Sequence, residues 1–453
     1  MARKSLMANF TEGSIPKQLF MFTAPLFLSS LLQTFYNMAD MIIVGQKLGQ
    51  IGISSVAIGG DVSHFLLFFS MGFSSAGQII LSQLIGSKQR EKVGKCIATM
   101  YTSMFALVVM LTVLCLIFRR SILNWMNTPE ASFDGALAYS TVCILGLLFV
   151  YGYNINSALL RGMGDSRHPF MFVTISTILN ILLDVLLVLV LDLGCLGAAL
   201  ATVVSQATSF LLGAVFLYKR RDELNIDFTL AFFLNIDKDL LSKLIKLGIP
   251  MAIKSASIQF SKLFVNSWIN SYGVSVSAFS GVASKVTNIP SLVTNSCAIS
   301  GSSMVGQNIG AKNYKRVSKI LITILVVVLV TVTVMSALVL AFPQQIYGIF
   351  SSEPEILDIA VEYAPIAVLV FFGCACRSPT NALINGSGNH KINFVTAILD
   401  GVVLRIGLAL LFGLILDFGY LGFWLGDALA SFTPAFIGIA FFLSGKWKKS
   451  LVD

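Results

Sequence analysis

Apolar runs long enough to cross a lipid bilayer recur along the whole chain, and they constrain its fold more than any other feature. They begin near Leu19, Ser54, Gly94, Gly135, Phe170, Cys195, Ile245, Ala278, Val317, Leu357, Ile392 and Tyr420. A membrane-spanning helix needs about 20 mostly apolar residues. The 453 residues are 56% hydrophobic and 12% charged, whereas soluble domains carry about 25% charged residues. We therefore expect an all-α membrane protein with twelve transmembrane helices.

The basic residues lie mainly in alternate loops and at both ends of the chain. The main groups are Arg3 and Lys4, Lys88–Lys95, Lys219–Arg221, Lys312–Lys319 and Lys446–Lys449. Because Lys and Arg mark cytoplasmic loops, we expect a multi-pass protein of the bacterial plasma (inner) membrane with both termini in the cytoplasm. The net charge of +9 then reflects topology, and no nucleic-acid partner is expected.

An internal repeat with an offset near 224 residues divides the chain into two halves. Gln83–Lys95 and Gln307–Lys319 are identical at six of 13 positions, and Pro25 has its counterpart in Pro250. Each half has six spans, so both halves start on the same side and the repeat is parallel, with a pseudo-two-fold axis along the membrane normal. We expect an N-terminal six-helix bundle over 1–220, a cytoplasmic linker over 221–240 and a C-terminal six-helix bundle over 241–453.

Asp40 is the most informative polar residue within the first span. An ionisable residue at the centre of a membrane helix costs about 2.5–3.5 kcal/mol on insertion scales, which makes it a functional candidate. Gln33, Tyr36 and Asp40 follow one another at spacings of three and four, so they share one helix face.

The fifth and sixth spans carry a second polar group. Asn180 and Asp184 are four residues apart, and so are Thr202 and Gln206. Two carboxylates, an amide and a hydroxyl offer the oxygen ligands that a hard cation prefers; alternatively, two close carboxylates share a proton. Each residue alone is also typical of a helix–helix hydrogen bond, and together they favour an ion site.

Other polar residues in the spans suggest a substrate cavity. The candidates are Gln33, Tyr36, Asn37, Asn154, Asn156, Gln206, Lys254, Gln259 and Lys262. The last three give the C-terminal half a basic wall, unless Lys254 pairs with a carboxylate or extends to the membrane surface. Asp61 and His64 form either a proton relay or an ordinary polar contact.

Three motifs together resemble the multidrug and toxic compound extrusion (MATE) family. They are Pro25 with Gln33–Asp40 and Gly45–Gln46, then Leu160–Asp165, then Gly306–Ala311. The resemblance covers nearly the whole chain. It implies two six-helix bundles in a V shape around a central cavity.

Within that family the chain is similar to the DinF-like branch, whose cation site lies in the N-terminal bundle. The resemblance assigns that site to Asp40, Asn180, Asp184 and Thr202, with Na⁺ as the bound metal if transport is sodium-coupled. The NorM-like branch has further acids on its seventh and tenth helices, where this chain has only Glu362. The resemblance therefore implies coupling confined to the N-terminal half.

These observations lead to a secondary active multidrug exporter as the expected function. We expect it to antiport amphipathic organic compounds against H⁺ or Na⁺ by alternating access, as a monomer, with no other cofactor. The alternative is a flippase or exporter of an anionic or lipid-linked substrate, favoured by Lys254, Lys262 and Arg377. The sequence has no phosphate-binding loop for ATP, so we do not expect an ATP-driven pump. We also do not expect the protein to be an enzyme. The partners expected are a small amphipathic organic substrate and the lipid bilayer.

Overall fold

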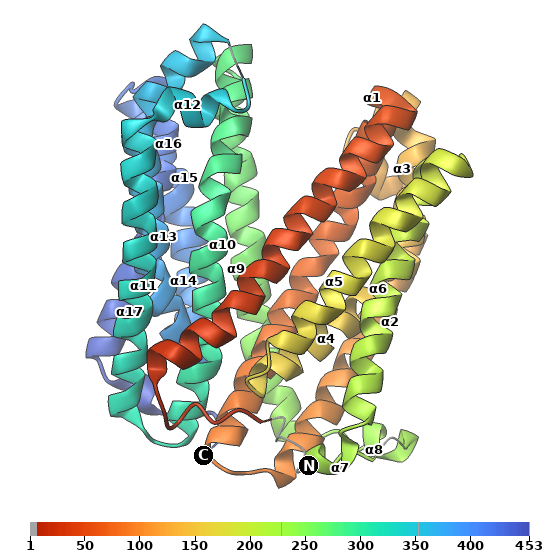
Figure 1. Cartoon of the computed structure of the whole chain (residues 1–453), viewed down its shortest axis with the longest axis vertical. Helices are drawn as coiled ribbons and strands as arrows, with labels where there is room; N and C mark the ends of the chain where they lie inside the picture. The colour runs from red at the N-terminus through yellow and green to blue at the C-terminus, as the bar shows by residue number, and fades with distance from the viewer. Residues whose placement is uncertain (1–6, 228, 352, 453) are drawn as a thin grey trace. The chain divides into compact units, whose positions relative to one another are not determined.

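The computed structural model describes residues 7–227, 229–351 and 353–452, which are almost entirely helical. Arg3 and Lys4 lie outside these residues. The first half contains α1 (Ile15–Gly86), α2 (Glu91–Trp125), α3 (Glu130–Leu145), α4 (Leu147–Gly162), α5 (Arg167–Asp184), η1 (Val185–Val190), α6 (Gly194–Tyr218), α7 (Arg221–Leu224) and α8 (Leu230–Leu234) (Figure 1).

The second half repeats this order with more interruptions. It contains α9 (Lys238–Asn270), α10 (Val274–Gly310), α11 (Tyr314–Ala341), α12 (Pro343–Gly348), α13 (Pro354–Ser387), α14 (His390–Ile398), η2 (Leu399–Val403), α15 (Leu404–Leu410), η3 (Leu411–Ile415), α16 (Gly419–Ala430), α17 (Thr433–Leu443) and η4 (Lys446–Lys448).

The twelve predicted spans are accommodated by these helices. Among the described residues, eight helices are long and apolar enough to cross a membrane, and α3 with α4, bent by 48°, make a ninth. The 72-residue α1 is two helices joined at Gly49, whose φ of 61° and ψ of −153° break the helix. The more polar α9 and α10, with 33 and 37 residues, have the length for the remaining two spans.

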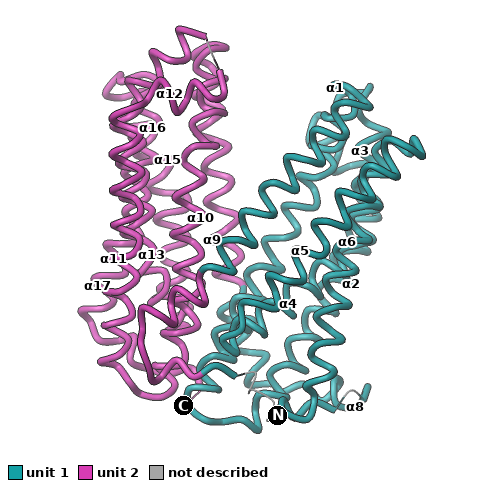
Figure 2. Tube along the Cα trace, in the orientation of Figure 1, with its two compact units in different colours: residues 1–8, 24–248 teal, residues 9–23, 249–453 magenta. Residues whose placement is uncertain are grey.

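The chain forms two compact units that exchange short segments (Figure 2). Unit 1 comprises Met1–Ala8 and Ala24–Gly248, and unit 2 comprises Asn9–Thr23 and Ile249–Asp453. The segment just before α1 packs within unit 2, where the Arg316 guanidinium donates to the carbonyl oxygens of Phe10, Glu12 and Gly13 at 2.8–2.9 Å. Pro25 and Pro250 lie just after two of the three points at which the chain passes between the units, and proline removes a backbone hydrogen bond from a helix.

The internal repeat extends to backbone detail. Gly164 and Gly388 adopt left-handed φ values of 87° and 69°, as tight turns at these positions require. Gly162 and Gly386 instead allow close helix packing, because a Cβ there would lie 2.9 Å and 2.8 Å from a carbonyl oxygen of a neighbouring helix.

A π-helix followed by a tight turn recurs in each half. η1 precedes Asp192 and η3 precedes Asp417, and both aspartates are left-handed, with φ of 55° and 56°. The repeat offset is 224 at Gly164 and Gly388 but 225 at these aspartates. The second half has the extra π-helix η2 between these positions, and a π-helical turn accommodates an inserted residue.

Gly422 tests how tightly this motif is packed. A Cβ at Gly422 would lie 2.3 Å from the Phe412 carbonyl oxygen, whereas one at Gly407 would meet nothing within 4 Å. Overpacking costs about 1–3 kcal/mol, so Gly422→Ala is expected to lower the melting temperature of the purified protein and Gly407→Ala is not. Thermal unfolding followed by size-exclusion chromatography measures both, and equal melting temperatures would contradict the described packing.

Candidate functional site

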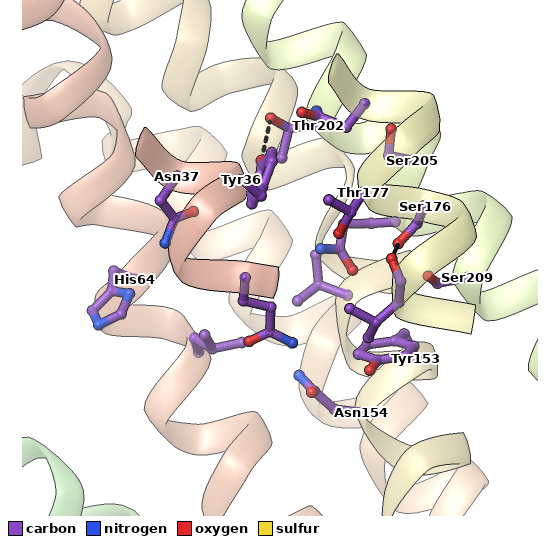
Figure 3. A pocket seen from close by; sticks show the side chains of 16 residues that line it. Tyr36, Asn37, His64, Tyr153, Asn154, Ser176, Thr177, Thr202, Ser205 and Ser209 are labelled. Carbon is purple, nitrogen blue, oxygen red and sulfur yellow. Dashed lines mark hydrogen bonds between the residues drawn. The ribbon is translucent and has the colours of Figure 1, made fainter. Parts of the chain in front are cut away.

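Two adjoining cavities of about 260 and 340 Å³ lie within unit 1. Both are lined by Tyr36 and Asn37 of α1 and by Thr202 and Gln206 of α6. Figure 3 shows the smaller one, in which the hydroxyls of Tyr36 and Thr202 form a hydrogen bond of 3.1 Å. This bond joins the first and sixth predicted spans.

Two buried carboxylates adjoin these cavities. Asp40 is 7% exposed and lines the larger cavity, while Asp184, at the end of α5, is fully buried. The two carboxylates are close enough to interact electrostatically. In each, Oδ1 is buried without a hydrogen-bond partner among the described residues. A buried oxygen without a partner is costly, so each carboxylate has an open position for a proton or a cation.

Asn180 holds Asp184 in place. With its amide nitrogen turned toward Asp184, Asn180 donates to Oδ2 at 2.8 Å, and its amide oxygen accepts from the Thr202 backbone N–H at 3.2 Å. The spacing of four residues on α5 brings the Asn180 amide beside the carboxylate. Asp184 also ends the α-helical part of its span, because the π-helix η1 starts at Val185, and π-helical turns are frequent at functional sites.

The predicted ion-site residues are thus brought together by α1, α5 and α6. Among the described residues there is no cluster of three or more His, Cys, Asp or Glu side chains that could hold a metal. A cation here would depend on the Asp40 and Asp184 carboxylates with neutral oxygens beside them. Asp61 and His64 also line the larger cavity.

Most of the substrate residues predicted in the first half line the cavities. Gln33, Tyr36, Asn37, Asn154 and Gln206 do so, and the Asn154 amide donates to Ser70 Oγ at 3.1 Å.

Asn156, the remaining candidate of the first half, lines neither of these two cavities, and its side chain is fully buried. It accepts a hydrogen bond from the Tyr101 hydroxyl and donates to the Phe210 carbonyl oxygen at 3.0 Å. Gly213 leaves room for it, since a Cβ there would lie 2.6 Å from the Asn156 amide nitrogen.

Several polar residues of the smaller cavity were missed at the level of the sequence. Ser176 and Thr177 on α5, and Ser205 and Ser209 on α6, all line it (Figure 3). Ser176 lies one helical turn before Asn180, and Ser205 and Ser209 continue the helix face of Thr202. Extending the two predicted polar faces along their helices would have found them.

The other predicted residues belong to unit 2. Lys254 donates to Asn381 Oδ1 at 2.8 Å rather than to a carboxylate. Gln259 is exposed on α9, and Lys262 lines a separate cavity of about 250 Å³. Two carboxylates of this unit, the buried Asp400 and the partly exposed Asp427, bind Arg405, which donates to Asp400 at 2.9 Å and also to Asp427.

An all-helical membrane chain with polar cavities and buried carboxylates inside its spans defines a membrane transporter. The family model MatE matches residues 25–186 and 250–432. The chain belongs to this family, as its motifs indicate, and is a transporter rather than an enzyme.

Known proteins are similar over nearly the full length. The chain is 29% identical over 446 residues to the probable multidrug resistance protein YoeA of Bacillus subtilis, covering 98% of this chain and 96% of YoeA. It is 22% identical to the multidrug export protein MepA of Staphylococcus saprophyticus, covering 87% of each.

Solved structures share the fold. A MATE in the bent conformation superposes with a TM-score of 0.88 at 21% identity, over 98% of both chains. A MOP superfamily transporter from Pyrococcus furiosus, described as having a binding pocket of reverse polarity, gives 0.88 at 22% identity, over 99% of this chain and 100% of the other.

Proposed function

We propose that the protein is a secondary active exporter that antiports amphipathic organic compounds against H⁺ or Na⁺. The observation that carries this proposal is the pair of buried carboxylates, Asp40 and Asp184, beside a polar cavity, each with one oxygen that has no partner in the part of the chain that the structure describes. A charged group within a membrane span is energetically costly. A role in ion coupling explains why two carboxylates lie close together inside the spans. The names of YoeA and MepA support drug export as the outcome.

Coupling requires that the ion binds one conformation more tightly than another. An ion that binds both states equally shifts no population. Protonation or cation binding at Asp40 and Asp184 would remove their mutual repulsion and satisfy their open oxygens, which favours the state in which the site is closed. Release of the ion restores the repulsion between the two carboxylates, which favours the state in which the cavity is open.

The arrangement of Asn180 bears on the choice between the two ions. Its amide oxygen faces the Thr202 backbone N–H and its nitrogen faces Asp184. A proton needs only the open carboxylate oxygens, whereas Na⁺ would gain the Asn180 oxygen as a ligand only after the amide turns. The site as described therefore favours H⁺, and sodium coupling requires a rearrangement of Asn180.

The proposal also covers the residues of the ion site, the membrane in which the protein lies and its oligomeric state. The ion site comprises Asp40, Asn180, Asp184 and Thr202, as in the DinF-like branch, and the neighbouring cavities bind a small amphipathic substrate. We place the chain in the bacterial plasma membrane as a monomer with both termini in the cytoplasm, on the basis of its loop charges.

Transport by purified protein in proteoliposomes tests this function. Efflux of the cationic dye rhodamine 6G and of the anionic dye fluorescein would be followed under an imposed proton or sodium gradient. Wild type is expected to export at least one dye under one gradient, and Asp40→Asn is expected to lose gradient-driven export. Asp192→Asn is the matched control, because that exposed carboxylate pairs with Lys47 at 3.2 Å.

Two outcomes would contradict the proposal. One is export by Asp40→Asn at the wild-type rate and with the same gradient dependence. The other is the absence of gradient-driven export of both dyes by wild-type protein that elutes as a single species. Loss of export in Asp192→Asn as well would show a general effect of charge rather than a role for Asp40.

A further inference from the structure

The cavity of unit 2 is the repeat-related counterpart of the larger cavity of unit 1. It measures about 250 Å³ and lies among α9, α10, α13 and α16. At offsets of 224 and 225, the corresponding lining residues are Asn37 and Lys262, Met41 and Asn266, Val56 and Ser280, Ser63 and Thr287, Tyr139 and Tyr363, and Thr202 and Asp427. The burial pattern supports this register, since Asp40 and Val44 are buried, as are Val265 and Ile269.

The charged residues that line the two cavities differ: Asp40 and Asp61 line the larger cavity of unit 1, whereas Lys262 and Asp427 line the cavity of unit 2. Val265 stands where Asp40 is, and Lys262 stands where Asn37 is. Arg405 occupies the position of Asn180 at the same offset, and its guanidinium binds both Asp400 and Asp427. Among the described residues, the cavity of unit 2 thus has an ammonium group and an arginine-bound carboxylate where the cavity of unit 1 has a carboxylate with one unpartnered oxygen.

The charge of the Lys262 ammonium group is only partly compensated within the protein. Among the described residues it forms no ion pair, and the nearby Asp427 already accepts from Arg405. Lys262 interacts electrostatically with Asp427, which attracts it, and with Arg405 and Arg377, which repel it. The cationic side chains in this region therefore outnumber its two carboxylates. An uncompensated charge within a membrane span is costly, and an anionic ligand would compensate it.

The remaining lining provides hydrogen-bond donors and an aromatic wall. Ser280 donates to Asn266 Oδ1 at 2.7 Å, and within the described part of the chain the Asn266 amide nitrogen has no acceptor, so it can donate to a ligand. Asn266 lies four residues after Lys262, on the same face of α9. Tyr363 and Trp424 pack edge to face with ring centroids 5.0 Å apart. A flat aromatic ring can pack against such a wall.

We propose that this cavity binds an amphipathic aromatic anion, with its carboxylate, sulfonate or phosphate group on Lys262 and Asn266 and its ring against Trp424 and Tyr363. The inference rests on the proposed export function, for which it names the substrate class. The same anionic chemistry is offered by a free organic acid and by a lipid headgroup, and the aromatic wall favours the free organic acid.

Equilibrium binding to the full-length protein in nanodiscs tests the cavity without any ion gradient. The probe is radiolabelled 2-naphthoate in phosphatidylcholine nanodiscs, with neutral 2-naphthamide and cationic 2-naphthylmethylammonium as competitors. Lys262→Gln is expected to bind 2-naphthoate about 10- to 100-fold more weakly, as for loss of one charge-assisted hydrogen bond. Lys262→Arg should retain most of the affinity, and Lys319→Gln, an exposed lysine of the same unit, should bind like wild type.

The outcomes separate this inference from the proposed function. Binding that is equal in wild type and Lys262→Gln, or competition by the amide and the amine as strong as by unlabelled 2-naphthoate, would overturn the inference. Gradient-driven export of rhodamine 6G alone would then leave the proposed function intact. Conversely, Lys262-dependent binding without any gradient-driven transport would support the cavity and contradict the antiporter.

The source of the anion is tested by the lipid. Repeating the assay in nanodiscs that contain phosphatidylglycerol adds a competing anionic headgroup. If phosphatidylglycerol lowers 2-naphthoate binding in wild type and Lys262→Arg but leaves the residual binding of Lys262→Gln unchanged, a lipid headgroup is the competing occupant of the same anion site. Unchanged binding in wild type indicates that the site selects the free aromatic acid.

Discussion

Asp184→Asn is expected to abolish ion-driven export while the protein still folds. Asp184 is fully buried, and one of its oxygens has no partner among the described residues. Asparagine is similar in size to aspartate and can still accept a hydrogen bond from Asn180. Its neutral side chain neither takes up a proton nor balances the charge of a cation. An ion that binds both conformations equally does not shift the balance between them. We therefore expect the rate of gradient-driven dye export to fall by about 100-fold or more.

The measurement is dye efflux from proteoliposomes at matched protein content. Asp134→Asn, an exposed carboxylate of α3, is the control and should export normally. Asn180→Ala separates the ions: under proton coupling it should retain gradient dependence, whereas under sodium coupling it should raise the Na⁺ concentration needed for half-maximal export. Normal export by Asp184→Asn would exclude this carboxylate from coupling.

Arg405→Met is expected to be the most destabilising substitution in unit 2. The guanidinium is 1% exposed and binds Asp400, also 1% exposed, and Asp427, which is 26% exposed. Its Nε also donates to the Asp400 carbonyl oxygen at 3.3 Å. Removing one partner of a buried ion pair leaves an uncompensated charge and costs about 3–5 kcal/mol.

Thermal unfolding of the detergent-solubilised protein provides the measurement for Arg405. Arg119→Met is the control, since Arg119 is exposed and donates only to the Leu116 carbonyl oxygen among the described residues. Changing Asp400 to Asn together with Arg405→Met removes one orphaned charge and should recover part of the lost stability. A loss for Arg405→Met no greater than that for Arg119→Met would show that the ion triad does not stabilise unit 2.

Much of the architecture could be predicted because it depends on local and periodic features. Hydropathy locates the spans, since each must be apolar over its full length. The repeat relates the turns at Gly164 and Gly388, which both adopt the left-handed conformation. The spacing of four between Asn180 and Asp184 placed both on one helix face, and the two side chains do meet.

The side-chain environment needed the tertiary structure. Asn156 lies in the same helix as Asn154, yet only Asn154 lines a cavity, because the helix buries one face against α2 and α6. Sequence separation likewise gives no sign that Arg405 binds both Asp400 and Asp427, or that residues 9–23 pack in unit 2.

The physical reason for this division is the difference between a pattern along one helix and a contact between helices. Apolar length and residue spacing are properties of a single segment, so the chain itself determines the spans, the repeat and the polar faces. Which faces meet depends on how bulky and small residues fit across helix pairs. Only the folded chain therefore decided that α1, α5 and α6 bring Tyr36, Thr202 and Asn180 together. It also decided that Lys262 faces a cavity without forming an ion pair among the described residues.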